Sequence, residues 1–188
     1  MSGGTVLYHG SHCVVRVPDL SRCAPGKDFG RGFYLTTDLE QARKFVATSV
    51  RKAVARGVEG ADPSRGFVSA FEFVPSAALS RHDFPEADIA WLRCVVAHRR
   101  RGCVPGELEK WAGQDLICGK IADDRTNSVI AAFLDGVYGP VESERAAELA
   151  IGFLEPGKLR DQWCFRTEKA LACLKFVSAE EVPLWETR

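Results

Sequence analysis

The stretch that most constrains the fold is residues 67–74, with the sequence FVSAFEFV. Its alternate positions carry Phe, Ser, Phe and Phe on one side, and Val, Ala, Glu and Val on the other. Side chains of a strand alternate between the two faces of its sheet, so both faces of this segment are mostly apolar. It therefore predicts a strand that is buried on both faces. The chain has 188 residues, of which 46% are hydrophobic, so it can supply the core that such a strand needs.

Further short strands and helices are predicted along the rest of the chain. Apolar segments that end in turn residues predict strands over 5–10, 32–36, 115–124, 162–167 and 174–185. Helical spacing predicts helices over 39–56, 83–101, 126–136 and 143–157, the first with a capping box at Thr37 and Glu40. The strands bracket the helices without regular β-α alternation. We therefore expect the α+β class, in a single domain over residues 1–188.

The charge balance argues against a protein that binds nucleic acid through bulk charge. Lys and Arg together number 25, and Asp and Glu also number 25, so the net charge is zero. The one obvious basic run, Arg99–Arg101 after His98, is read as a solvated helix end that complements the helix dipole.

Cysteine usage and the N-terminus point to a reducing, cytoplasmic setting. The seven cysteines include no C-x-x-C pair, and no metal-ligand spacing is visible among them and the four histidines, so no metal is expected. Most of the cysteines stand in apolar contexts typical of buried small hydrophobes. The N-terminus has no basic region followed by an apolar segment, and no apolar run reaches the length of a membrane span.

Two motifs place glycine beside a polar or aromatic residue at the end of a strand. One is YHGS, which holds His9 and Gly10, and the other is FGRGFYLTTD, which holds Tyr34. They resemble the motifs of ADP-ribosyltransferases of the diphtheria-toxin and poly(ADP-ribose) polymerase type, where His, Tyr and Glu follow in this order. In that group a second aromatic lies eleven positions past the tyrosine, and here that position is Phe45, on a predicted helix.

The chain also resembles a bacterial family of unknown function that is assigned to this fold. That family shares a start of the form YHGS…DFG.GFYLT and a late segment of the form DQ.CF.TEKAL..L.F, which is DQWCFRTEKALACLKF in residues 161–176 here. The resemblance covers most of the chain, but residues 75–115 match nothing known to us. It implies an ADP-ribosyltransferase-like core, with short, mainly antiparallel strands in a split sheet and flanking helices.

The resemblance implies a mono-ADP-ribosyltransferase with NAD as its substrate. The acceptor is a protein, a nucleic acid, a small molecule or water. Cleavage of the nicotinamide–ribose bond passes through an oxocarbenium-like centre. The residues assigned to NAD by the motifs are His9 for the adenine-side ribose, Gly10 for the carboxamide, Tyr34 and Phe45 for the nicotinamide ring, and the adjacent Ser11 and Gly32. Arg16, Arg22, Lys27 and Arg31 are candidates for the pyrophosphate.

The third catalytic position departs from the pattern of the group. The alignment places Gln162 where the group has a glutamate that holds the reacting ribose hydroxyl. A neutral amide can accept the hydrogen bond but brings no negative charge, so single transfer is expected rather than chain extension. Glu168 is the reserve candidate, and Asp123 and Asp124 are further sources of a carboxylate.

Two other hypotheses about the function are compatible with the sequence. A non-catalytic module that binds NAD or an ADP-ribose-like ligand is compatible with the neutral Gln162. A cysteine nucleophile is the third reading, because Cys164 lies two residues from Gln162, but no His-Cys motif accompanies it.

Overall fold

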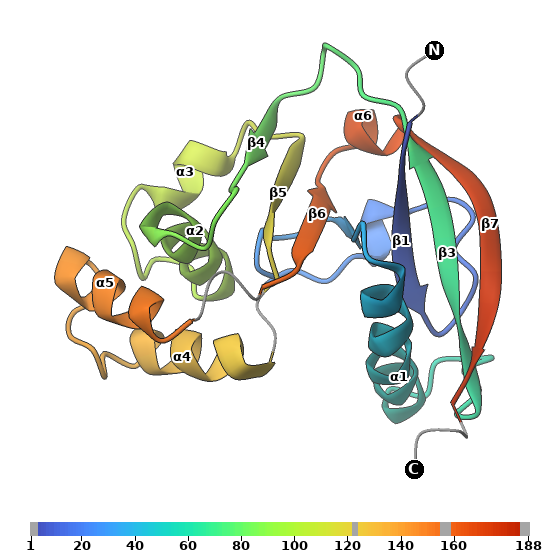
Figure 1. The fold of residues 1–188 in the computed structure, drawn as a ribbon, viewed down its shortest axis with the longest axis horizontal. Helices are drawn as coiled ribbons and strands as arrows, with labels where there is room; N and C mark the ends of the chain where they lie inside the picture. Colours follow the sequence, from blue (N-terminus) through green and yellow to red (C-terminus); the bar gives the residue numbers. More distant parts are fainter. Residues whose placement is uncertain (1–3, 122–123, 155–158, 185–188) are drawn as a thin grey trace. The chain divides into compact units, whose positions relative to one another are not determined.

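The computed structural model describes residues 4–121, 124–154 and 159–184 (Figure 1). The chain divides into two compact units that are interleaved along the sequence. The first unit comprises Met1–Asp19, Tyr34–Ala77 and Leu171–Arg188, and the second comprises Leu20–Phe33 and Ala78–Ala170. The α+β class is confirmed, and the expectation of a single domain stays a prediction.

A three-stranded antiparallel sheet forms the first unit. Its order is β1 (Thr5–Ser11), β3 (Arg65–Phe73) and β7 (Leu174–Pro183), so β3 is the central strand. Helix α1 (Leu39–Ala55) packs on β1 and β3 (Figure 1). On this side the buried cluster consists of Ala42, Val46, Val50 and Val68, with Tyr8 packed against it.

The opposite face of β3 is also covered, as its sequence predicts. Phe71 is fully buried and meets Phe176 edge to face, with 5.9 Å between ring centroids. Ser69 is fully buried too, and its hydroxyl oxygen accepts a hydrogen bond of 3.0 Å from the main-chain N–H of Val15. The segment after β1 therefore lies over this face, and the prediction of a strand buried on both faces is confirmed.

Helix α1 begins one residue away from the predicted capping box. Asp38, rather than Thr37, is the N-cap, and its carboxylate accepts a 3.0 Å hydrogen bond from the N–H of Gln41. Asp38 takes this position because its own N–H donates to the hydroxyl of Thr36, which fixes the turn before the helix. The register of the helix is nevertheless as predicted, since its buried face repeats at helical spacing.

The second sheet has four strands in the order β2 (Phe33–Leu35), β6 (Asp161–Phe165), β5 (Leu116–Lys120) and β4 (Arg81–Asp83). β5 pairs with β6 antiparallel and with β4 parallel. The other elements of the second unit are η1 (Leu20–Arg22), α2 (Ile89–Arg99), α3 (Glu107–Trp111), α4 (Asp124–Leu134) and α5 (Glu144–Gly152). A short helix, α6 (Glu168–Leu171), follows β6.

Helix α2 is the buried helix of the second unit and contacts α3, α4 and α5. Six of its eleven residues are fully buried: Trp91, Leu92, Cys94, Val95, Val96 and Ala97. The predicted helix over 83–101 was too long, because residues 81–83 form β4 and Asp88 caps the helix through the N–H of Trp91. No helix in the described part of the chain is both long and apolar enough to cross a lipid bilayer.

Asp115 is a buried carboxylate that joins three segments of the second unit. It accepts hydrogen bonds from the N–H of Ser80 at 2.9 Å, the hydroxyl of Thr167 at 2.8 Å and the ammonium of Lys169 at 2.9 Å. These donors lower the pKa of Asp115 to about 2, with the bond from Lys169 making the largest contribution. The side chain of Lys169 is half exposed, so the bonds from Ser80 and Thr167 carry more of the stabilisation.

We expect Asp115→Asn to lower the free energy of unfolding by about 1–3 kcal/mol at pH 7, because a neutral amide loses the ion pair with Lys169 and the charge that strengthens the other two hydrogen bonds. The folded-state pKa lies below the unfolded value. The carboxylate therefore stabilises the fold above about pH 4, and this contribution is lost as the pH falls toward 2. Urea unfolding at several pH values should show the two proteins converging in that range. A constant difference from pH 7 to pH 2 would contradict the role of the carboxylate.

Candidate functional site

The His and Tyr motifs meet in the first unit. Strand β1 pairs with β3 along one edge, and along the other edge Tyr8 forms a bridge with Thr36. The Tyr8 N–H donates to the Thr36 carbonyl at 2.8 Å, and the Thr36 N–H donates back at 3.0 Å. Beside this bridge, Nδ1 of His9 lies 2.8 Å from the carbonyl oxygen of Tyr34, which is 25 residues away in the sequence.

The hydrogen bond to Tyr34 fixes the proton position on His9. A carbonyl oxygen can only accept, so Nδ1 carries the hydrogen, and in the neutral ring Nε2 is then an acceptor. The pKa of His9 lies below its ordinary value, mainly because the ring is buried, with a further lowering from the charge of His12. His9 is therefore neutral at pH 7, with a lone pair on Nε2.

Gly10 is required by packing, and it also directs main-chain groups toward the bridged edge. A methyl group at Gly10 would overlap the carbonyl oxygen of Ala42 in α1, so only glycine allows the helix this close. Tyr8 directs its N–H and C=O at Thr36, and the direction of main-chain groups alternates along a strand. The N–H and C=O of Gly10 therefore point to the same edge of β1 as those of Tyr8.

The two predicted ring-stacking residues both reach the surface of the first unit. Tyr34 lies in the middle of β2 and is half-buried. Phe45 lies on α1, outside the buried face of that helix, and 44% of its surface is exposed. Ser11, by contrast, is buried, and it ends β1 opposite Phe67.

Gln162, Gly32 and Glu168 belong to the second unit. Gly32 is buried, and a methyl group there would overlap the sulfur of Cys164 and crowd the carbonyl of Phe165, so this glycine is required by packing. Glu168 is exposed in the first turn of α6.

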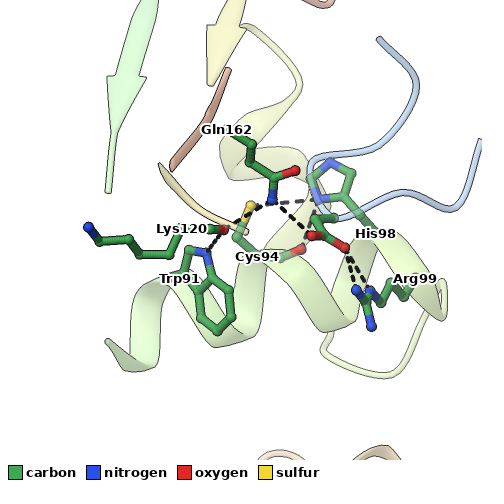
Figure 2. Close-up of polar contacts among 7 residues, drawn as sticks. Trp91, Cys94, His98, Arg99, Lys120 and Gln162 are labelled. Carbon is green, nitrogen blue, oxygen red and sulfur yellow. Dashed lines mark hydrogen bonds and ion pairs between the residues drawn. The ribbon is translucent and has the colours of Figure 1, made fainter. Parts of the chain in front are cut away.

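The side chain of Gln162 is buried and held through its amide nitrogen. Nε2 donates to Oδ2 of Asp28 at 2.8 Å and to the carbonyl oxygen of Lys120 at 3.0 Å. Figure 2 shows Gln162 with this nitrogen turned toward Lys120 and its amide oxygen turned away. Within the part of the chain that the structure describes, Oε1 has no hydrogen-bond partner. An acceptor at a fixed position is thus available at the sequence-predicted third residue.

Asp28 is the residue that the sequence reasoning missed. It is buried, with 8% of its surface exposed, and it bonds Gln162 through Oδ2. Its other oxygen, Oδ1, accepts from Nε of Arg99 at 2.9 Å and from Nη2 at 2.5 Å. A signal was present in the sequence, because the DFG and DQ segments that carry the family resemblance contain Asp28 and Gln162.

The basic run after His98 is not a uniformly solvated helix end. Arg99 pairs with the buried Asp28, and Arg100 binds the C-terminal end of α4 through the carbonyl of Leu134 and the carboxylate of Asp135. Two of the three arginines are therefore engaged within the second unit.

Several other sequence candidates are placed as follows. Arg16 lies over the ring of Phe176, with 4.9 Å to the ring centroid, and Arg22, Lys27 and Arg31 are exposed. Asp124 begins α4, and Asp123 lies outside the described residues.

The alternative nucleophile, Cys164, is fully buried, and its thiol lies 3.9 Å from the carbonyl oxygen of Phe29. This packing gives it no access to a substrate. Within the described ranges, no group of three or more His, Cys, Asp or Glu side chains is arranged to hold a metal ion.

A family model matches residues 5–176, which is most of the chain and includes both motifs and Gln162. The chain belongs to the DUF3990 family. The family is described as a protein of unknown function, so membership assigns no activity. A comparison with curated proteins gives no match.

We expect His9 to titrate below pH 6.5, with the proton of the neutral ring on Nδ1, when followed by NMR of the imidazole nitrogens. Since the folded-state pKa is lowered, protonation favours the unfolded chain, and stability is lost as the pH falls below about 6.5. His9→Asn removes this titration, because its side-chain amide donates to Tyr34 without ionising. A midpoint at or above 6.5, or an Nε2–H tautomer, would show that burial does not control this ring.

Proposed function

We propose that this protein is a mono-ADP-ribosyltransferase with an ADP-ribosyltransferase-like core. It cleaves the nicotinamide–ribose bond of NAD and transfers ADP-ribose to an acceptor or to water. The observation that carries the proposal is the 2.8 Å hydrogen bond from His9 to the carbonyl of Tyr34. It brings the two motifs on which the family resemblance rests to one place, although they are 25 residues apart in the sequence.

In this proposal the main chain of Gly10 binds the nicotinamide carboxamide. A carboxamide presents one C=O and one NH₂ group, which a neighbouring N–H and C=O of a strand edge complement. Gly10 directs such a pair to the bridged edge of β1.

The aromatic rings of Tyr34 and Phe45 are assigned to the nicotinamide ring. Stacking adds about 0.5–1.5 kcal/mol per ring beyond burial, and the positive charge of nicotinamide in NAD favours aromatic faces. An apolar ring as exposed as Phe45 gives up contact with water when a ligand covers it. His9 is assigned to the adenine-side ribose, where Nε2 accepts a hydrogen bond from a hydroxyl.

Gln162 is assigned to the ribose next to nicotinamide, where Oε1 accepts a hydrogen bond from a hydroxyl. In the reaction the electron pair of the C–N bond leaves with nicotinamide, which departs as a neutral molecule. The ribose becomes an oxocarbenium-like cation. The acceptor then bonds to the anomeric carbon and loses its proton to solvent. Gln162 is preferred to Glu168 because two hydrogen bonds from Nε2 fix its amide, whereas Glu168 is exposed.

A second candidate function is an NAD-binding or ADP-ribose-binding module with little or no turnover. The neutral amide at Gln162 favours it, because an amide stabilises a cation less than a carboxylate does. Incubation with NAD and measurement of free nicotinamide separates the two. Binding of NAD without nicotinamide release would identify the module, and absence of binding would reject both.

We expect His9→Asn to fold with the stability of the wild type at pH 7 but to bind NAD about 5- to 15-fold more weakly. The asparagine amide keeps the donor to Tyr34, whereas the acceptor at Nε2 is lost, which costs about 1–1.5 kcal/mol. His9→Ala, which loses both groups, should also be less stable. Calorimetric titration with NAD and thermal unfolding test this. Unchanged affinity in His9→Asn would restrict His9 to a structural role.

We expect Phe45→Ala to weaken the binding of nicotinamide by about 2- to 13-fold, which is the effect of losing one stacking partner. Tyr34→Ala should act in the same direction. ADP-ribose lacks the nicotinamide ring, so its affinity should change by less than about two-fold.

Val54→Ala is the matched control, because Val54 lies on the same helix with the same 44% exposure and has no assigned role. Equal losses for nicotinamide and ADP-ribose in Phe45→Ala, or a similar loss in Val54→Ala, would remove Phe45 from the site.

A further inference from the structure

We propose that Asp28 is a positioning residue for Gln162. Its carboxylate, together with the main-chain carbonyl of Lys120, fixes the Gln162 amide so that Oε1 is the acceptor presented to the substrate. The identity of the substrate group, a ribose hydroxyl of NAD, rests on the proposed function.

The chemistry of the two partners allows only one orientation of the amide. The carboxylate of Asp28 is paired with Arg99 and therefore offers only acceptors, and the carbonyl of Lys120 is also an acceptor. They lie 2.8 and 3.0 Å from Nε2 and use both of its hydrogens. A flipped amide would bring Oε1 against two acceptors, which is unfavourable in a buried position.

Both acceptors are themselves held in place. Arg99 binds Oδ1 of Asp28 through two nitrogens, which leaves Oδ2 for Gln162. The indole N–H of Trp91, a fully buried side chain of α2, donates to the Lys120 carbonyl at 3.0 Å (Figure 2). The amide is thus oriented by a supporting network from the loop before β2, from α2 and from the end of β5. Such support is what a fixed functional group requires.

The same network explains why the side chain at position 162 is an amide. A glutamate there would place a second carboxylate within hydrogen-bond distance of Asp28 and of the Lys120 carbonyl, with no donor between them. Two buried carboxylates at this separation cannot both ionise without a large cost. The negative charge therefore resides on Asp28, and Gln162 presents an oxygen whose amide is polarised by its bond to that charge.

The test is Asp28→Asn, which can turn its own amide toward Gln162 and so permits the flip. We expect kcat for NAD cleavage to fall about ten-fold, a part of the roughly 10²-fold that one preorganised contact supplies. KM should stay within about two-fold. In a Gln162→Ala background Asp28→Asn should have no further effect on kcat, because the group it positions is absent.

Asp115→Asn is the matched control. Asp115 is also a buried, ion-paired aspartate of the second unit, but its carboxylate binds Ser80, Thr167 and Lys169, so kcat should be unchanged when measured well below the unfolding temperature. A kcat within two-fold of wild type in Asp28→Asn would overturn the proposal. So would a loss that persists in full in the Gln162→Ala background.

A second measurement does not depend on activity or on the variant folding. In the wild-type protein, NMR of the Gln162 side chain should show two distinct, slowly exchanging amide protons and a scalar coupling across the bond from Nε2 to the Lys120 carbonyl. Fast exchange without that coupling would overturn the positioning role. If the wild type releases no nicotinamide while the amide is fixed in this way, the proposed function fails and the positioning by Asp28 stands.

Discussion

Helix α1 lies against β1 at a point where only a hydrogen atom fits between them. A methyl group on Gly10 would overlap the Ala42 carbonyl, and one on Gly66 of β3 would overlap the side chain of Val46 and crowd that of Val50. Two glycines on neighbouring strands thus allow the apolar face of the helix to approach the sheet closely. This contact fixes the position of β1 and of the residues on both of its faces.

The chemistry of the first unit follows from that fixed strand. Tyr8 packs against the buried cluster between α1 and the sheet, so its neighbour His9 lies on the opposite face of β1. There the His9 ring meets the carbonyl of Tyr34. Burial keeps the imidazole neutral, and the carbonyl determines which nitrogen carries the proton. The lone pair on Nε2 of His9 and the direction of the Gly10 main-chain groups therefore both follow from the way β1 packs.

The second unit uses two buried aspartates in different ways. Asp115 is saturated by donors from the main chain, a hydroxyl and an ammonium, and its structural partners consume both oxygens. Asp28 binds Arg99 and the amide of Gln162, and within the described residues the oxygen of that amide has no hydrogen-bond partner. The difference lies in what the partner can still do. Lys169 and Thr167 only hold the fold together, whereas Gln162 keeps an oxygen that binds no other group in the described part of the chain.

The sequence by itself determined the elements whose signals are local. The alternation in 67–74 and the periodicity of α1 specified the buried strand and the helix, because each depends on neighbours within a few residues. The apolar run before His9 specified β1, which continues one residue past the predicted end at Gly10. Strand β4 and helix α3 were missed, since three and five residues are too few to show a period.

Only the tertiary structure decided the surroundings of Gln162. Its partner Asp28 is 134 residues away, and no local pattern relates the two. A glutamine side chain can present either an N–H or an oxygen to a ligand, and the sequence does not determine which of the two it presents. The fold brings a carboxylate and a carbonyl to the same side of the amide, and two acceptors on one side leave the oxygen on the other.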